Sequence, residues 1–260
     1  MSIRICQIGA LVKLSVLELY RRKDMIVVFI LGAVILLPLM LFSPFGVSGA
    51  SRYVNELTLL LVWLFSLVIG LGVSARLFPY EFESRTIYPL LSKPVSRGTL
   101  LVGKYLGALT ASVFALTVLY LAYGILAGVR QGVWFPLVLV QAFVLHIGFL
   151  VVVTALGLAG SLVMTPSANL TVNALLVVGM LFYGQKLPSL AVSQPPFGRC
   201  ILTLLHWIGP HTEFFDLRQR VVHEWPAIGW GVCFAVLVYA AGYAAVCLAL
   251  AAVAFRNKRF

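Results

Sequence analysis

The most constraining feature of this sequence is the length of its charge-free apolar runs. Residues 131–185 contain no Asp, Glu, Lys or Arg, and residues 25–51 and 57–75 contain none either. A helix needs about 20 mostly apolar residues to cross the hydrocarbon core of a bilayer. Such runs form helices because lipid satisfies no backbone polar group, whereas the strands of a membrane barrel would alternate in polarity, which these runs do not. The sequence therefore predicts an all-α integral membrane protein.

Composition and charge agree with a membrane protein. Of the 260 residues, 62% are hydrophobic and 10% are charged, against about 25% charged in soluble proteins. The formal net charge of +11 comes from basic residues that flank the apolar runs, so we assign it to topology and contact with membrane lipids and expect no nucleic acid partner. The four cysteines show no C-x-x-C spacing, and they predict neither a disulfide framework nor a metal site.

The chain divides into an N-terminal segment, residues 1–24, and a membrane-spanning domain, residues 25–260. Apolar residues of the first segment recur at three- and four-residue steps, which is typical of an amphipathic helix lying in the membrane interface; they are Ile5, Ile8, Val12, Val16 and Leu19. A proline-bearing stretch at 165–169 divides the longest apolar run. Six transmembrane helices are expected, at about 25–42, 57–75, 105–127, 135–164, 170–184 and 227–255.

Basic residues set the expected orientation. If the N-terminus lies inside, thirteen of the 19 Lys and Arg residues fall on the inner side. The positive-inside rule then places both termini in the cytoplasm. We expect a multi-pass protein of the cell membrane, in a prokaryotic cytoplasmic membrane.

The loop at residues 76–104 is the most informative part of the sequence. Aromatic and apolar residues are mixed there with acidic and basic ones over about three turns. Such a segment can lie on the membrane or fill a groove on a cytosolic partner, and the residues alone leave both open. Pro94 biases Lys93 away from helix and ends the segment before the third span.

This loop resembles the cytoplasmic loop of ABC type-2 transporter permeases. The resemblance rests on paired acids, a threonine, a Leu-Leu pair, a Ser-x-Pro-x-Ser-Arg motif and a Gly-Lys pair, which are Glu81 and Glu83, Thr86, Leu90 and Leu91, residues 92–97, and Gly103 and Lys104. One departure is Arg85, where many members of the family have glycine. The six-span layout extends the similarity to the whole chain.

The resemblance implies a function and a set of partners. In this family, a coupling helix between spans two and three, here about 79–92, transmits movement from a cytosolic ABC ATPase. The implied ATPase-coupling residues are Phe78, Tyr80, Glu81, Phe82, Glu83, Arg85, Thr86, Leu90, Leu91, Pro94 and Arg97. A second permease subunit, identical or different, is also implied. The partner ATPase would bind ATP and Mg²⁺, so this chain would be no enzyme, would hold no cofactor and would act as part of an exporter.

A near-match to a phosphate-binding loop does not change the prediction that this chain binds no ATP. Residues 98–105 almost fit G-x-x-x-x-G-K-[ST], but Tyr105 replaces the Ser or Thr that ligates Mg²⁺. Apolar residues fill the loop, no strand precedes it and a membrane span follows it. We therefore expect no ATP site here.

Several other residues were candidates for function. His146 lies within the fourth span, where a polar group is a possible functional site, although a neutral histidine bonded to a neighbour is favoured. His206, His211, Glu213, Asp216, His223 and Glu224 lack metal-site spacing, and Pro210 with residues 215–217 favours a structural outer element. The pairs Gly103/Gly107 and Gly124/Gly128 permit close helix contact in a dimer or within the chain. The Asn169 glycosylation sequon falls in an expected cytoplasmic turn and is discarded.

Two other classes of function remain as alternatives. A secondary carrier or channel independent of ATP would usually bury charged residues within its spans, and only His146 stands there. A membrane enzyme would need converging catalytic groups, which the sequence does not provide.

Overall fold

The computed structural model describes residues 8–14, 16–17, 30, 50–83, 96–132 and 134–257. Within these residues the chain is helical and contains no strand. The helices are α3 (Ala50–Ala75), α4 (Leu77–Glu83), α6 (Arg97–Gln131), α7 (Leu137–Ser161), α8 (Pro166–Tyr183), α9 (Leu187–Val192), α10 (Pro196–Ile208), α11 (Arg218–Val222) and α12 (Trp230–Asn257), with 3₁₀ turns η1 (Gly184–Lys186) and η2 (Thr212–Phe215).

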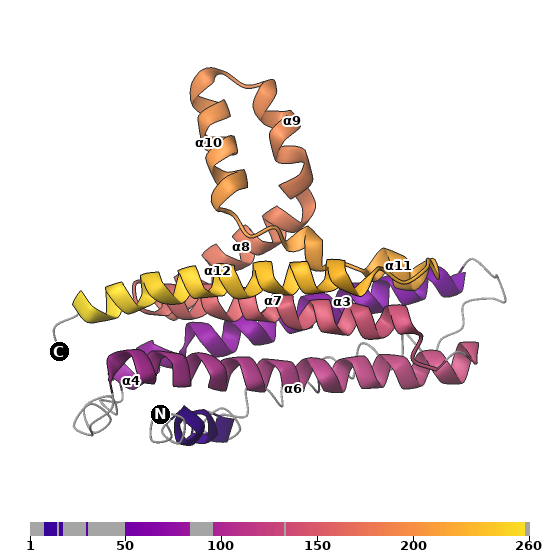
Figure 1. The fold of residues 1–260 in the computed structure, drawn as a ribbon, viewed down its shortest axis with the longest axis horizontal. Helices are drawn as coiled ribbons and strands as arrows, with labels where there is room; N and C mark the ends of the chain where they lie inside the picture. The colour runs from indigo at the N-terminus through magenta and orange to yellow at the C-terminus, as the bar shows by residue number, and fades with distance from the viewer. Residues whose placement is uncertain are drawn as a thin grey trace.

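Four long helices, α3, α6, α7 and α12, run side by side along the long axis of the molecule (Figure 1). α7 packs against the other three and against α8. Its side chains are apolar on all sides and most are buried; Phe149, Leu150, Val152 and Val153 are fully enclosed. A helix that is hydrophobic all round is stable only when surrounded, so α7 forms the centre of the bundle.

Local sequence signals explain where α6 begins and ends. Ser96 caps its N-terminus, accepting a hydrogen bond from the Thr99 backbone N–H at 3.1 Å. Gly132, with φ of 72°, ends it in the left-handed conformation that glycine adopts most easily. The chain then folds back on α6, and the Phe135 ring lies where a side chain at Gly124 would otherwise stand.

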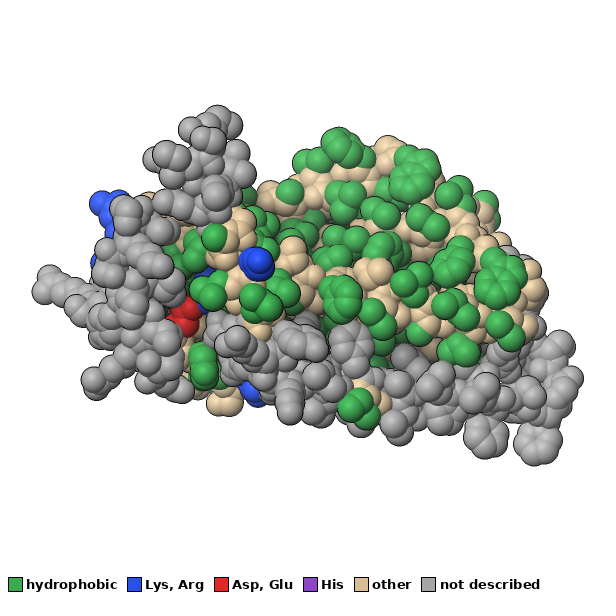
Figure 2. Space-filling view, turned by 90° about the horizontal axis from the view of Figure 1, so that it is seen from below, with side chains coloured by type: hydrophobic (Ala, Val, Ile, Leu, Met, Phe, Trp, Pro, Cys, Tyr) green, Lys and Arg blue, Asp and Glu red, His purple; other side chains and the backbone are tan. Residues whose placement is uncertain are grey.

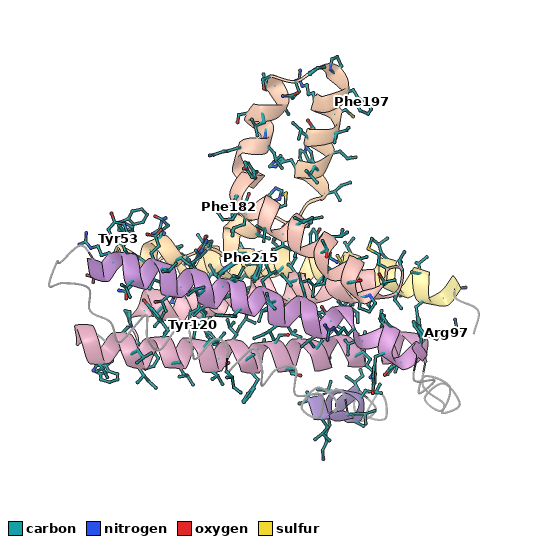
Figure 3. The ribbon with its side chains drawn as sticks, turned by 180° about the vertical axis from the view of Figure 1, so that it is seen from behind. Tyr53, Arg97, Tyr120, Phe182, Phe197 and Phe215 are labelled. Carbon is teal, nitrogen blue, oxygen red and sulfur yellow. The ribbon has the colours of Figure 1, made fainter. Side chains whose placement is uncertain are left out.

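The segment after α8 leaves the bundle and returns to it. α9 and α10 form a hairpin that projects sideways (Figure 1), and Phe197 lies near its far end (Figure 3). The chain then re-enters the bundle through η2, where Phe215 is 1% exposed and contacts α7 at Gly148. Residues 209–229 therefore pack along the bundle before α12 starts.

The surface of the molecule is largely apolar. Figure 2 shows a face on which the described side chains are mostly hydrophobic, with the few charged ones toward the half that holds both termini in Figure 1. Large hydrophobic side chains are exposed along α8 and α12, including Leu175, Phe182, Phe234 and Leu250. Such a surface suits contact with lipid or another subunit and does not suit water.

Five helices of the described part are long and apolar enough to cross a membrane. They correspond to the second to sixth predicted spans, although α3 begins at Ala50, α6 at Arg97 and α8 at Pro166, each earlier than predicted. The prediction for 25–42 falls outside the described residues except for Ile30, so six spans are not confirmed. Of the predicted N-terminal helix, residues 8–14 and 16–17 are described and helical.

Candidate coupling site and the buried polar cluster

The described part of the predicted coupling segment is α4, a short helix directly after α3. A single residue, Arg76, separates the two, and its carbonyl accepts a hydrogen bond from the Tyr80 N–H at 3.2 Å. Phe78 is fully buried, and its ring centroid lies 6.1 Å from that of Phe82 and 5.2 Å from that of Phe255 in α12. Tyr80 is 41% exposed. The helix thus has one face in the bundle and one outside it.

A buried ion pair joins α4 to α6. The Glu81 carboxylate contacts the Lys104 ammonium, and the two side chains are 3% and 1% exposed. Removing two charges from water is costly unless each finds an opposite charge. The pair therefore fixes α4 against the first turns of α6. A displacement of α4 would move α6 or break the ion pair.

Arg97 joins the start of α6 to the end of α12. Its guanidinium donates hydrogen bonds to the carbonyl oxygens of Phe255 at 3.2 Å and Arg256 at 3.1 Å. It also lies 5.8 Å from the centre of the Phe255 ring. The last carbonyls of a helix lack partners within the helix and carry partial negative charge, so a cation stabilises them.

The structure brings together only part of the predicted coupling set. Phe78 packs on α12, Glu81 pairs with α6, and Arg97 connects the start of α6 to α12. Tyr80 faces outward and Phe82 is half-buried. The family resemblance implies that Glu81 is an ATPase-coupling residue, and no signal in the sequence indicates its pairing with Lys104. The remaining members lie outside the residues whose side chains are described: Glu83, Arg85, Thr86, Leu90, Leu91 and Pro94. Contact of this set with an ATPase stays a prediction.

The near-match to a phosphate-binding loop lies within a continuous helix. Residues 98–105 all belong to α6. Leu11 packs so closely on Gly103 that a Cβ there would overlap it. Lys104 is paired with Glu81, and the Tyr105 hydroxyl donates to the Val151 carbonyl at 3.0 Å. These residues form helix contacts and do not form a loop around phosphates.

His146 is the centre of a polar cluster inside the bundle. Ser66 Oγ donates to the Trp63 carbonyl at 2.8 Å, so it accepts from His146 Nε2 at 2.6 Å. Tyr120 donates its hydroxyl to His146 Nδ1 at 3.1 Å; Figure 3 shows Tyr120 between α3 and α6. A neutral imidazole satisfies all these hydrogen bonds. The favoured interpretation, a neutral histidine bonded to neighbouring hydroxyls, is therefore supported.

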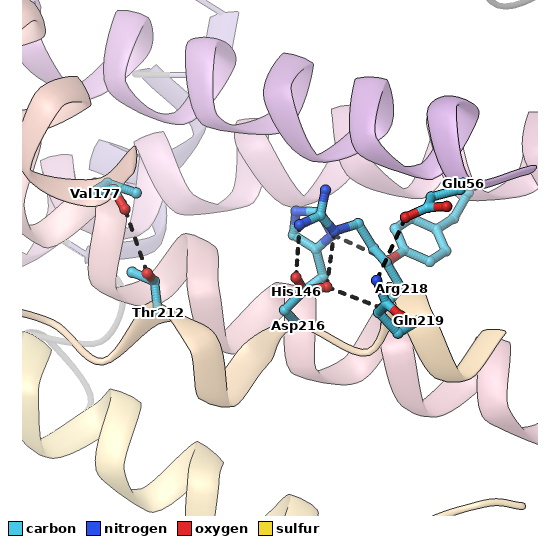
Figure 4. Close-up of polar contacts among 8 residues, drawn as sticks. Glu56, His146, Val177, Thr212, Asp216, Arg218 and Gln219 are labelled. Carbon is cyan, nitrogen blue, oxygen red and sulfur yellow. Dashed lines mark hydrogen bonds and ion pairs between the residues drawn. The ribbon is translucent and has the colours of Figure 1, made fainter. Parts of the chain in front are cut away.

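An ion pair from the stretch between α10 and α12, residues 209–229, lies beside this cluster (Figure 4). Arg218 binds Asp216 through two hydrogen bonds of 2.9 and 2.7 Å, and its guanidinium lies 5.6 Å from the centre of the Trp63 ring. The sequence analysis did not predict this pair, because Pro210 and residues 215–217 were expected to form only a structural element. The Asp-x-Arg spacing was the available signal.

Other hydrogen bonds attach residues 209–229 to the bundle. The Gln141 amide exchanges two hydrogen bonds with the Ile228 backbone, at 2.7 and 3.0 Å. Thr212 donates to the Val177 carbonyl at 3.4 Å (Figure 4). Gln141 and Thr212 are fully buried. The segment is therefore an integral part of the packed structure.

The remaining candidates have structural surroundings. Asn169 is fully buried and donates to the Gly157 carbonyl at 2.8 Å, which suits the rejection of its sequon. Gly124 and Gly128 contact Phe135 and Trp134 of the same chain. Among the described residues, no group of three or more His, Cys, Asp or Glu side chains could hold a metal ion.

The fold and these contacts define a multi-pass helical membrane protein. Comparison with protein families gives a more specific result: the model of the ABC-2 family transporter proteins matches residues 42–259. The chain belongs to this family. It is therefore a membrane component of an ABC transporter, a class that works with an ABC ATPase. A comparison with curated proteins found no match.

Proposed function

We propose that this chain is the permease subunit of an ATP-driven exporter, with both termini in the cytoplasm and α4 as the described part of the coupling element. A separate ATPase would bind ATP and Mg²⁺, and a second permease subunit would complete the path. The large apolar surfaces of α8, α12 and the α9–α10 hairpin support a partner in the membrane.

The observation that carries the proposal is the set of contacts around α4. This short helix is continuous with α3 through Arg76, is paired with α6 through Glu81 and Lys104, and packs on α12 through Phe78 and Phe255. A force applied to α4 would thus act on three candidate spans at once. Because packed interfaces shift between discrete arrangements, such a joint can convert partner movement into span movement.

Copurification with the ATPase encoded in the native host tests the proposal. Tyr80→Ala alters the exposed face of α4, and Tyr53→Ala alters an exposed tyrosine at the opposite end of the bundle (Figure 3). We expect Tyr80→Ala to lower the recovered ATPase several-fold and Tyr53→Ala to leave it unchanged. The reverse result would contradict both the coupling role of α4 and the proposed orientation.

One observation favours a second candidate, an ATP-independent carrier. The Asp216–Arg218 pair places charges against Trp63, near the middle of α3, and charges at membrane depth often serve ion coupling. Substrate uptake by liposomes that contain only this chain, with no nucleotide, would support the carrier and refute the ABC mechanism.

A further inference from the structure

A cavity of about 210 Å³ lies between the first turns of α3, the last turns of α6 and the start of α7, at the end of the bundle where Figure 3 labels Tyr53. Four helices contribute to its wall: Asn55 comes from α3, Tyr123 from α6, Leu139 from α7 and Val222 from α11. No part of the coupling site or of the His146 cluster lines it. The cavity is thus a separate feature of the fold.

Two buried polar side chains in this wall have no hydrogen-bond partner among the described residues. Asn55 is 8% exposed and Tyr123 is 5% exposed, and both line the cavity. The other buried asparagines of the described chain, Asn169 and Asn173, both form hydrogen bonds. The polar atoms of Asn55 and Tyr123 are not sealed off inside the protein, and both side chains line the cavity, so they can form hydrogen bonds with a polar guest there.

Charges of both signs stand at the same cavity. Arg220 and Glu224 line it. The Arg220 guanidinium lies 5.8 Å from the centre of the Trp225 ring and donates to the Pro226 carbonyl at 3.2 Å. No ion pair joins Arg220 to Glu224 in the described structure. Because the cavity opening presents one positive and one negative side chain, it suits a zwitterionic headgroup better than a simple anion or cation.

The backbone around the cavity is held in a rare conformation at two points. Phe135 and Glu224 have φ values of 44° and 53°, and both residues line the cavity. They are the non-glycine residues with positive φ in the described chain. Left-handed backbone at non-glycine residues persists where the surroundings impose it, and it concentrates at ligand sites.

The level of the cavity relative to the membrane identifies the kind of guest. Exposed aromatic residues surround this end of the bundle, namely Tyr53, Trp134, Trp225 and Trp230. Tyrosine and tryptophan collect where a bilayer meets water, so the cavity stands at headgroup level. Apolar residues such as Ala127 and Leu139 complete its wall, next to the position where an acyl chain would begin.

We propose that this cavity binds the phosphoethanolamine head of an amphiphile from the leaflet on the side opposite α4. Arg220 would receive the phosphate and Glu224 the ammonium group. Asn55 and Tyr123 would donate hydrogen bonds to the phosphate or the adjoining ester oxygens. Binding of this kind needs neither the ATPase nor transport.

The test uses the purified full chain in a neutral maltoside detergent without ATPase or nucleotide. The probe is lysophosphatidylethanolamine with a diazirine in its acyl chain, and a lysophosphatidylglycerol of equal length is the comparison. We expect saturable labelling of peptides from α6 or α11 by the ethanolamine probe. Asn55→Leu with Tyr123→Phe should weaken it by about tenfold or more.

Tyr243→Phe is the control, because Tyr243 lies on α12 away from the cavity and its hydroxyl donates to the Ile208 carbonyl of α10. Tyr123→Phe alone removes a single oxygen atom. It replaces the double variant in the labelling test if the double variant does not fold. Competition by soluble phosphoethanolamine would show that the head alone suffices; failure to compete would assign the site to lipid. Equal labelling by the glycerol probe, or undiminished labelling of a folded Tyr123→Phe chain, would overturn the proposal.

Discussion

The Glu81–Lys104 pair allows a quantitative test of the joint between α4 and α6. Both side chains are at most 3% exposed, so water screens neither charge after its partner is removed. Breaking a buried pair in this way costs about 3–5 kcal/mol. We therefore expect Glu81→Met and Lys104→Met each to lower the free energy of unfolding by that amount.

For a chain of this size, such a loss corresponds to a fall in melting temperature of roughly 6–20 °C. Tryptophan fluorescence of the detergent-solubilised protein during heating would measure it. The double variant Glu81→Met/Lys104→Met removes both charges of the pair together, so its melting temperature should lie above that of either single variant.

The Asp216–Arg218 pair provides the comparison, because its side chains are 19% and 17% exposed. Asp216→Asn keeps a side-chain oxygen that can accept a hydrogen bond from Arg218, so it should cost less than either change at the Glu81–Lys104 pair. If the losses from Glu81→Met and Lys104→Met simply add in the double variant, the two charges do not stabilise each other and the proposed joint is wrong.

Three further predictions concern the packing of the bundle. Gly157→Ala would place a methyl group on Ser74 Oγ and should cost about 1–3 kcal/mol in thermal unfolding, whereas Gly179→Ala, with open space around it, should be neutral; equal effects would refute this. Tyr120→Phe leaves His146 Nδ1 without its donor and should cost about 1–3 kcal/mol by the same assay; an unchanged melting temperature would contradict the cluster. Arg97→Gln should speed amide hydrogen exchange in the last turn of α12, because two carbonyls lose their cation; unchanged exchange there would argue against the cap.

The transmembrane helices could be predicted because their signal is local. A charge-free apolar run has few alternatives to a helix in lipid, and α7 and α12 follow such runs closely. Boundaries were less accurate where polar residues continue a helix. Arg97 is charged but begins α6 behind the Ser96 cap, and Pro166 begins α8 because proline fits the first turn of a helix.

The contacts that define the candidate sites could not be read from the sequence in the same way. The sequence places Glu81 in a polar loop, where an acidic residue is ordinarily exposed, and only the packing of α4 on α6 shows that Lys104 pairs with it. Likewise, His146 receives its partners from α3 and α6, and no local pattern identifies a serine and a tyrosine from two other helices. Non-local packing decides these features.

The central position of α7 has a consequence for movement. A helix that is enclosed by α3, α6, α8, α12 and the η2 turn can hardly rotate or slide without disturbing all its neighbours. The hairpin of α9 and α10 is different, because it stands away from the bundle and α10 buries none of its side chains. During a transport cycle, α7 would thus act as the stationary axis, and the largest rearrangements would occur where the chain is bound on one side only.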